Sequence, residues 1–162
     1  MSFIEHLIPF GFERKRNTSI NRVLDAVGYG LRGEGIDVGC FSATSCGILE
    51  RRGLNVTYVE RDSRCISTIR SKGYNVINTD VFEHLYTVNS LDFITFFGAP
   101  CDFSVYSLIS MAESKLSYGG NVIVTGYPNI EGQIDNALQC GGQKFKLSGV
   151  HDWDSVGYVY TK

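Results

Sequence analysis

The chain has 162 residues, of which 43% are hydrophobic and 20% are charged, and its formal net charge is −2. This length is typical of a single domain with its own buried core. The charge disfavours a protein that holds nucleic acid by overall charge alone, although a local basic patch stays compatible with it. No apolar run approaches the roughly 18 residues of a membrane span, so we expect no membrane partner. An acidic residue and a proline interrupt the apolar N-terminus, so we expect no signal peptide.

Residues 1–17 form an apolar and basic leader, followed by a single domain over residues 18–162. Apolar side chains that gather outside a core often mark contact surfaces. We therefore expect the leader to pack on the domain, to cover a ligand cleft or to form a homodimer contact. Its basic run, Arg14 to Arg16, either contacts a phosphate or faces solvent.

The first regular element is predicted from the apolar spacing of residues 20–27, which is helical, with Thr18 or Ser19 as the N-cap. A literal GxGxxG follows at residues 28–33. A dinucleotide-binding loop needs its glycines between a strand and the next helix, whereas these come after a helix. We therefore interpret them as a C-cap and turn.

From residue 35 onward, strand-like and helix-like segments alternate. Helices are predicted over residues 44–52, 63–72 and 104–116, closed by Gly53, Gly73 and the SYGG of residues 117–120. Strands are predicted over residues 35–40, 55–60, 74–80, 91–98, 121–127, 144–150 and 155–162.

This alternation predicts an α/β fold, a doubly wound and mostly parallel sheet of seven strands with helices on both faces. The last two strands are joined by the short polar segment HDWD at residues 151–154. They therefore predict a C-terminal antiparallel β-hairpin at the end of the sheet.

A second glycine signal, DVGCFSA at residues 37–43, directly follows the first predicted strand and opens a helix. Glu60 ends the next strand, about 20 residues on, where a ribose-binding carboxylate belongs. Asp80 ends the third strand, and Phe97 and Gly98 end the fourth. Because the carboxyl ends of parallel strands line the ligand crevice of such sheets, these residues predict a nucleotide-type site.

Over residues 18–162 the chain resembles the class I (Rossmann-like) S-adenosylmethionine-dependent methyltransferases, whose first motif is an acidic residue followed by x-G-x-G-x-G. Asp37 and Gly39 match this motif, while Phe41 and Ala43 replace its second and third glycines, so the motif is degenerate. Within the family, residues 37–53 look most like the first motif of methyltransferases related to haemolysin A.

The resemblance implies a cytoplasmic transferase that uses S-adenosylmethionine, with Glu60 on the ribose hydroxyls and Asp80 on the adenine amino group, beside Val81 or Phe82. The cofactor-binding residues that it implies are Asp37, Gly39, Cys40, Phe41, Ala43, Glu60, Arg61, Asp80, Val81, Phe97 and Gly98.

Two other interpretations stay open. A nicotinamide dinucleotide site wants glycines where this chain has Phe41 and Thr44, and the terminal hairpin also disfavours it. The eroded glycine loop, the lack of an Asn-Pro-Pro-Tyr type acceptor motif and the apolar leader instead fit a catalytically inactive methyltransferase-like binding or assembly module.

The methyl acceptor, whether a small molecule, RNA or protein, is not identified by the sequence. Its side of the site normally follows the fourth strand, where Asp102 is a candidate base and Cys101 a weaker candidate nucleophile. Because burial and capping explain such residues equally well, the catalytic residue stays open.

The cysteines and histidines predict neither disulfides nor a metal site. The odd number of cysteines, without a CxxC pair, indicates free thiols in a reducing compartment. The three histidines are scattered through the chain. The cysteines are Cys40, Cys46, Cys65, Cys101 and Cys140, and the histidines are His6, His84 and His151.

Overall fold

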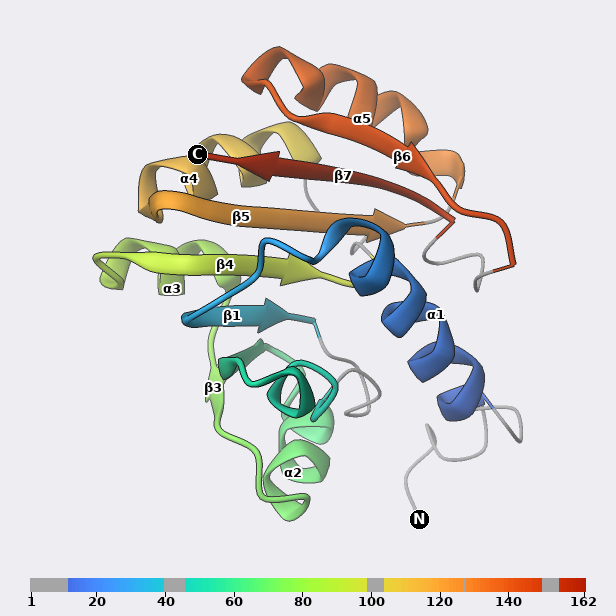
Figure 1. Ribbon diagram of the computed structural model, residues 1–162. Coiled ribbons are helices and arrows are strands. Elements are labelled where there is room, and N and C mark those ends of the chain that lie inside the picture. The colour runs from blue at the N-terminus through green and yellow to red at the C-terminus, as the bar shows by residue number, and fades with distance from the viewer. Residues whose placement is uncertain (1–11, 40–45, 99–103, 127, 150–154) are drawn as a thin grey trace.

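The protein is described by a computed structural model that covers residues 12–39, 46–98, 104–126, 128–149 and 155–162. Its centre is a seven-stranded sheet in the order β3-β2-β1-β4-β5-β7-β6 (Figure 1). The strands are β1 Glu34–Val38, β2 Asn55–Glu60, β3 Val76–Asn78, β4 Leu91–Phe96, β5 Leu116–Gly126, β6 Gln143–Lys146 and β7 Val156–Thr161.

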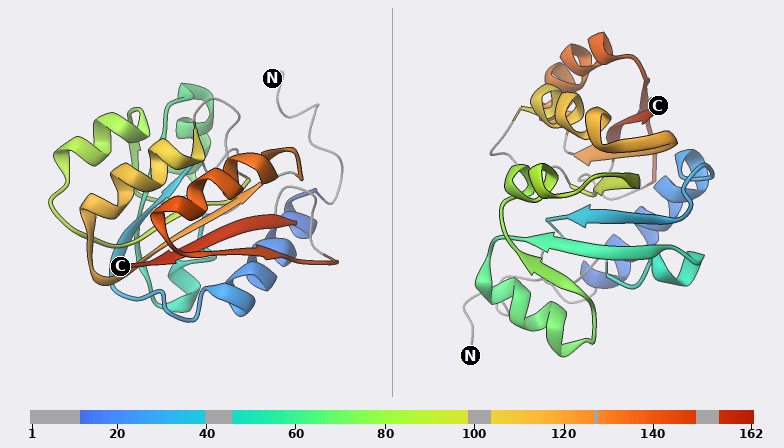
Figure 2. Two further views of the ribbon diagram at one scale, coloured as in Figure 1. Left: turned by 90° about the horizontal axis from the view of Figure 1, so that it is seen from above. Right: turned by 90° about the vertical axis from the view of Figure 1, so that its left-hand side faces the viewer.

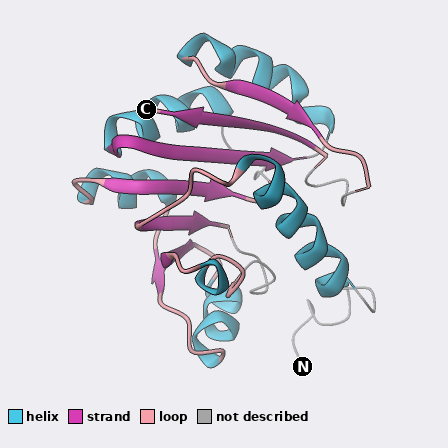
Figure 3. Cartoon of the chain, in the orientation of Figure 1, coloured by secondary structure: helices cyan, strands magenta, loops and turns pink. Residues whose placement is uncertain are grey.

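Strands β1 to β5 are parallel, and β7 runs antiparallel to both of its neighbours, β5 and β6 (Figure 3). The predicted doubly wound sheet with an antiparallel C-terminal pair is therefore confirmed. The sequence did not predict the order of these two strands. In the structure β7 lies between β5 and β6, and β6 is the edge strand.

Helices cover both faces of the sheet, with α1 on the opposite side from α4 and α5 (Figure 2). The α-helices are α1 Phe12–Val27, α2 Ser63–Ser71, α3 Val81–Thr87, α4 Val105–Lys115 and α5 Glu131–Ala137. Short 3-10 turns are η2 Glu50–Arg52, η3 Pro128–Ile130 and η4 Leu138–Cys140.

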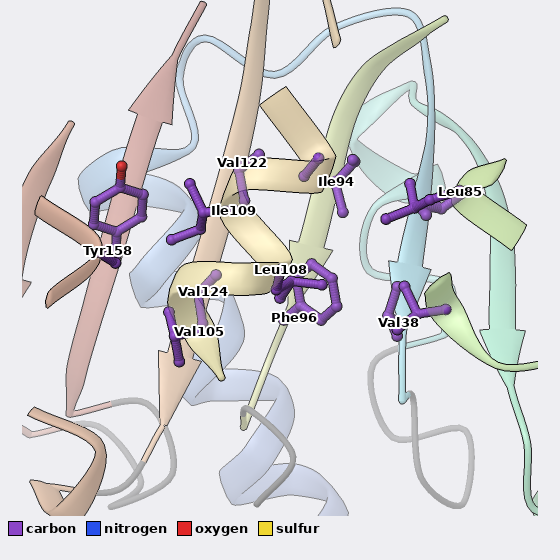
Figure 4. Close-up of a cluster of buried hydrophobic side chains, with 14 of the residues drawn as sticks. Val38, Leu85, Ile94, Phe96, Val105, Leu108, Ile109, Val122, Val124 and Tyr158 are labelled. Carbon is purple, nitrogen blue, oxygen red and sulfur yellow. The ribbon is translucent and has the colours of Figure 1, made fainter. Parts of the chain in front are cut away.

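The two faces bury separate hydrophobic cores. On one, α3, α4 and α5 pack on aliphatic and aromatic strand residues that include Val38, Ile94 and Phe96 (Figure 4). On the other, α1, α2 and residues 46–49 pack on strand residues that include Tyr58 and Phe93. Alternate residues of one strand serve the two cores because successive side chains point to opposite faces.

Helix α1 begins at Phe12, so the predicted N-cap at Thr18 or Ser19 is wrong. The Thr18 hydroxyl donates to the Arg14 carbonyl, 2.9 Å away, inside the helix. A threonine that bonds back to the preceding turn is compatible with a helix interior. Residues 1–11 of the leader lie outside the described residues.

The helix predicted over residues 44–52 is not confirmed, because its described part consists of turns at residues 46–49 followed by η2. Gly47 has a φ of 82°, which an α-helix does not accommodate. The predicted cap at Gly53 is confirmed, with a φ of 83°.

The SYGG at residues 117–120 was also misassigned, because it lies inside β5. Leu116 is already extended where α4 ends, so no glycine cap is needed. The register between β4 and β5 shifts near these glycines, which is typical of a β-bulge. Helices α3 and α5 were not predicted at all.

The GxGxxG at residues 28–33 lies between α1 and β1, as the C-cap interpretation predicted. The amide of Gly28 donates to the Leu24 carbonyl at 2.8 Å and so continues the end of α1. Gly33 has a φ of 73°, and a Cβ there would lie 2.0 Å from Oδ2 of Asp92. These glycines therefore form the predicted turn, and Gly33 also allows a close approach to Asp92 that was not predicted.

None of the described helices is long and apolar enough to traverse a lipid bilayer. The cysteines that the structure describes, Cys46, Cys65 and Cys140, are free thiols.

Candidate cofactor site

The carboxyl ends of β1 to β5 lie along one edge of the sheet, which we call the carboxyl edge. At its centre the chain reverses its direction of growth, since β2 and β3 lie to one side of β1 while β4 and β5 lie to the other. Open α/β sheets bind ligands outside such a reversal, where the loops that follow neighbouring strands diverge. A ligand site in this sheet is therefore expected beside the carboxyl end of β1.

Asp37 lies in β1, one residue before its end, and is 1% exposed. The Thr95 hydroxyl on the adjacent strand β4 donates to Oδ1 of Asp37 at 2.7 Å. Because Ile36 and Val38 pack in the α3–α5 core, Asp37 points to the opposite face. It is a fixed buried acceptor next to the carboxyl end of β1.

Gly39 directly follows β1, and its amide donates to the Val59 carbonyl of β2 at 3.0 Å. Its φ of 70° lies in the left-handed region that favours glycine. A Cβ built on it would meet no described heavy atom within 4 Å. The backbone at Gly39 is thus held in place and has open space on its side-chain face.

Glu60 ends β2, the neighbour of β1, and is largely buried. Its Oε1 accepts from two successive backbone amides, those of Arg61 at 2.8 Å and Asp62 at 2.9 Å. No described residue donates to its other oxygen, Oε2. One oxygen therefore orients the carboxylate, and the second can accept a hydrogen bond from a ligand hydroxyl.

The side chain of Asp62 caps α2 by accepting from the Arg64 amide and also binds the Arg64 guanidinium, with a 2.6 Å ion pair. The hydrogen bond from the Arg64 side chain, the Arg64 amide and the positive charge of Arg64 lower the pKa of Asp62 to about 2. This carboxylate is already satisfied, so Glu60 is the acidic group at this turn with an oxygen available to a ligand.

Asp80 follows β3 and caps α3, because its Oδ1 accepts from the Phe82 amide at 2.8 Å. Its second oxygen, Oδ2, has no partner among the described residues. Val81, the first residue of α3, is buried in the α3–α5 core, and Phe82 is half-buried beside it. Asp80 therefore has a structural role at this edge and still presents one acceptor.

Phe97 and Gly98 directly follow β4. The Phe97 side chain packs in the α1–α2 core, which leaves its backbone at the carboxyl edge. The Gly98 amide donates to the Thr125 hydroxyl of β5 at 2.9 Å. The turn after β4 is thus fastened to its neighbour, much as Gly39 is fastened to β2.

Comparison with known proteins gives matches in structure alone: no protein-family model matches this sequence, and no curated protein does. A SAM-dependent methyltransferase of Archaeoglobus fulgidus matches with a TM-score of 0.71 at 14% identity, over 93% of this chain and 94% of that one. The PH0226 protein of Pyrococcus horikoshii gives 0.76 at 13% identity, over 95% and 92%. Magnesium protoporphyrin IX methyltransferase of Synechocystis, solved with bound SAM, gives 0.67 at 13% identity, over 100% and 85%.

The chain has the class I methyltransferase fold. The resemblance seen in the sequence is confirmed at this level.

Within the methyltransferase fold, the described part of the predicted site gathers at the carboxyl edge. This part consists of residues that lie in the four strands β1 to β4 or at most two positions beyond their ends, namely Asp37, Gly39, Glu60, Asp80 and Gly98. The remaining predicted positions, Cys40, Phe41, Ala43, Cys101 and Asp102, lie outside the described residues. Within the described ranges, no three His, Cys, Asp or Glu side chains lie close enough together to hold a metal ion.

Tyr58 is a residue at this site that the sequence reasoning missed. It is fully buried in β2, accepts from the Gly47 amide at 2.9 Å and donates to Oε2 of Glu50 at 2.6 Å. Its ring also meets Tyr74 edge-on. Burial, the negative charge of Asp37 and the bond to Glu50 raise the pKa of this hydroxyl far above its usual value.

Gly39 and Gly47 flank residues 40–46 in the sequence. Their amides bond to two successive residues of β2, the Gly39 amide to the Val59 carbonyl and the Gly47 amide to the Tyr58 hydroxyl. The one sequence signal for the role of Tyr58 is its position in a predicted strand, two residues before Glu60. That signal is weak, since a tyrosine in a central strand normally serves the core.

Proposed function

We propose that this protein transfers a methyl group from S-adenosylmethionine to an acceptor, with the cofactor at the carboxyl edge of β1 to β4. The observation that carries the proposal is the arrangement of Glu60, whose Oε1 is fixed by two backbone amides while Oε2 has no described donor. A carboxylate held in this way can accept hydrogen bonds from the paired hydroxyls of a ribose.

The other described residues fit the same ligand. The open space beside Gly39 allows a close approach of the amino acid part of the cofactor to the backbone. Asp80 retains one carboxylate oxygen for an amino donor such as that of adenine. Asp37 and Thr95 set the end of β1 beneath this position.

When bound, S-adenosylmethionine supplies a methyl group on a positively charged sulfur, ready for in-line displacement. The chain's part is then chiefly alignment, since orienting two reactants removes much of the entropic barrier. A base is needed only where the acceptor loses a proton. We assign the acceptor side to the loop after β4 and keep Asp102, then Cys101, as candidate groups there.

We also propose a cytoplasmic location. The free thiols of Cys46 and Cys65, both buried, are compatible with a reducing compartment. A homodimer through the leader stays a proposal as well.

The proposal is tested by isothermal titration of the purified protein with S-adenosylmethionine, S-adenosylhomocysteine and, as a control ligand, NAD. We expect micromolar binding of the first two and none of NAD. Glu60→Ala is expected to weaken cofactor binding at least tenfold, since it removes a charged acceptor worth roughly 1.5–3 kcal/mol.

A matched control is Glu34→Ala, which removes an exposed glutamate at the amino end of β1 and should leave the affinity unchanged. Equal affinity in Glu60→Ala and the wild type, with both folded by circular dichroism, would refute the ribose assignment. No binding of either sulfur ligand would refute the proposal and favour the noncatalytic binding or assembly module.

A further inference from the structure

The net charge of −2 conceals a strong asymmetry between parts of the chain. Residues 12–27, 46–53 and 61–72 carry ten of the 15 lysines and arginines but four of the 17 acidic residues, a net charge of +6. The remainder of the chain is therefore at −8. Eight of the nine arginines are in these three segments.

The three segments are adjacent in space, since α1, residues 46–49 and α2 share one core on one face of the sheet. The Arg52 guanidinium of η2 reaches α1, with hydrogen bonds to Asn21 and an ion pair with Asp25 at 2.7 Å. Beyond α2, the Tyr74 hydroxyl lies where a side chain at Gly47 would be. We call the outer surface of these segments the basic face.

Much of this positive charge is exposed to solvent. Arg14, Lys15, Arg51 and Arg70 are all exposed, and none has an ion-pair partner among the described residues. The acidic side chains of the same segments are partly used, because Asp25 pairs with Arg52 and Asp62 with Arg64. The exposed excess is thus available to an anionic partner.

The basic face reaches the cofactor site. The first turns of α1 lie toward the carboxyl edge, and the segment that follows its last turn leads back across the sheet to the start of β1 (Figure 1). Arg14 and Lys15 are in these first turns, and Arg61 directly follows Glu60. At 1.5 Å per residue, the 16 residues of α1 give the face a length of about 24 Å, enough for several nucleotides of an extended strand.

We propose that the basic face binds a nucleic-acid strand through its phosphates. The further step, that the strand is the methyl acceptor and is led along α1 to the carboxyl edge, rests on the proposed function. Arginine predominates on this face, and its planar guanidinium binds phosphate oxygens in a bidentate manner. A surface with several such groups suits a polyanion.

Judged from the described residues, an anionic membrane is the less suitable partner for this face. Peripheral membrane surfaces combine basic side chains with large apolar ones that enter the bilayer. The large hydrophobic side chains exposed within the described ranges all lie outside the three segments. They are Tyr29, Ile77, Tyr106, Tyr118 and Leu138.

The test is fluorescence anisotropy with a labelled single-stranded RNA of about 20 nucleotides, longer than a typical single-strand site, and with DNA of the same sequence. Binding is titrated at several salt concentrations. The variant Arg14→Glu/Lys15→Glu is compared with Arg32→Glu/Lys162→Glu, which changes the net charge equally at exposed positions outside the three segments.

We expect Arg14→Glu/Lys15→Glu to weaken binding at least tenfold and to reduce the slope of log K against log salt by about 1.4, or about 0.7 per lost phosphate contact. The control should change affinity by about twofold at most, through long-range charge alone. RNA and DNA are expected to respond alike, because phosphate contacts do not distinguish the sugars.

Equal losses in the two double variants, or no binding of either strand at low salt, would overturn the proposal. So would binding to phosphatidylserine vesicles without binding to RNA or DNA. Titration with S-adenosylmethionine in the same variants separates the two proposals. Nucleic-acid binding without cofactor binding refutes only the proposed methyltransferase function. Cofactor binding without nucleic-acid binding refutes only the proposal that the basic face binds nucleic acid.

Discussion

The two faces of the sheet differ in what they bury. The face covered by α3, α4 and α5 is packed with aliphatic and aromatic side chains. Every buried polar or charged residue among those described belongs to the other face. Two of them lie on α1, and the others lie on strands, next to a residue that packs in the α3–α5 core. Because successive strand residues point to opposite faces, these strand residues point toward α1 and α2. The buried polar or charged residues are Arg16, Ser19, Asp37, Glu60, Thr95, Asn121 and Thr125.

This difference separates two tasks within one sheet. Apolar packing supplies stability without directional demands, whereas a buried polar group needs a partner at a defined position. Burial on the α1–α2 face therefore carries a larger desolvation penalty. In return, the paired polar groups orient the side chains that reach the carboxyl edge. The basic face is the outer surface of the elements that cover this same face of the sheet. The buried polar residues and the positive surface therefore lie on one side of the sheet.

The largest effect is expected on the apolar face. Leu108→Ala removes a fully buried side chain of α4 and should lower the free energy of unfolding by about 3 kcal/mol, through lost burial and the cavity left behind. Urea denaturation measures the loss. The affinity of the folded fraction for S-adenosylmethionine should not change, and a drop in it would contradict the separation of the two faces.

An intermediate effect is expected from Thr95→Val, which keeps the side-chain shape and removes the hydrogen bond to Asp37. A lost bond to a buried charged group should lower the free energy of unfolding by about 2 kcal/mol. Cofactor affinity should fall as well, because the end of β1 loses its orientation.

The reciprocal variant on the apolar face, Val124→Thr, buries a hydroxyl among apolar side chains and should also destabilise the fold, but without affecting cofactor affinity. A neutral Thr95→Val would mean that the polar pairing contributes nothing.

The smallest effect concerns the partly exposed ion pairs between β6 and α5. Lys144 and Lys146 of β6 bind Glu131 of α5 at 2.6 and 2.8 Å and lower its pKa from 4.5 to about 2. Because the pKa is lower in the folded state, the stabilisation is present above pH 4.5 and is lost as the pH falls toward about 2.

Glu131→Gln should therefore melt slightly below the wild type near neutral pH, and the two melting curves should converge near pH 2. Scanning calorimetry at a series of pH values measures this. Added salt should shrink the difference, since exposed pairs are screened. A constant difference across all pH values would show that the carboxylate charge is not the cause.

The elements that could be predicted from the sequence are those with a strong local signal. β2 was predicted with its observed bounds because an unbroken run of β-branched and aromatic residues extends up to Glu60. α2 was predicted to within a residue because apolar spacing ends at a left-handed Gly73. α3 and α5, of seven residues each, are too short for their periodicity to stand out.

Local glycine signals failed where a distant residue changed their meaning. Gly47 interrupts a helix-like sequence because its amide bonds to Tyr58. Gly119 and Gly120 look like a helix cap but are paired with the C-terminal residue Lys162 across the sheet. In both cases the deciding partner lies outside the local segment, 11 residues away for Gly47 and at Lys162 for Gly119 and Gly120, and the local spacing does not reveal that the two meet.

The sequence by itself thus determined the alternation of strands and helices, the rejection of the first GxGxxG and the placement of Glu60 and Asp80 near strand ends. All of these follow from short-range periodicity and capping. The tertiary structure alone decided that β7 inserts beside β5, that Thr95 meets Asp37 and Tyr58 meets Gly47, and that arginines from three separate segments share one face. These depend on which strands pair and how helices pack, and such long-range contacts are selected by the burial of the whole sheet rather than by any local stretch of chain.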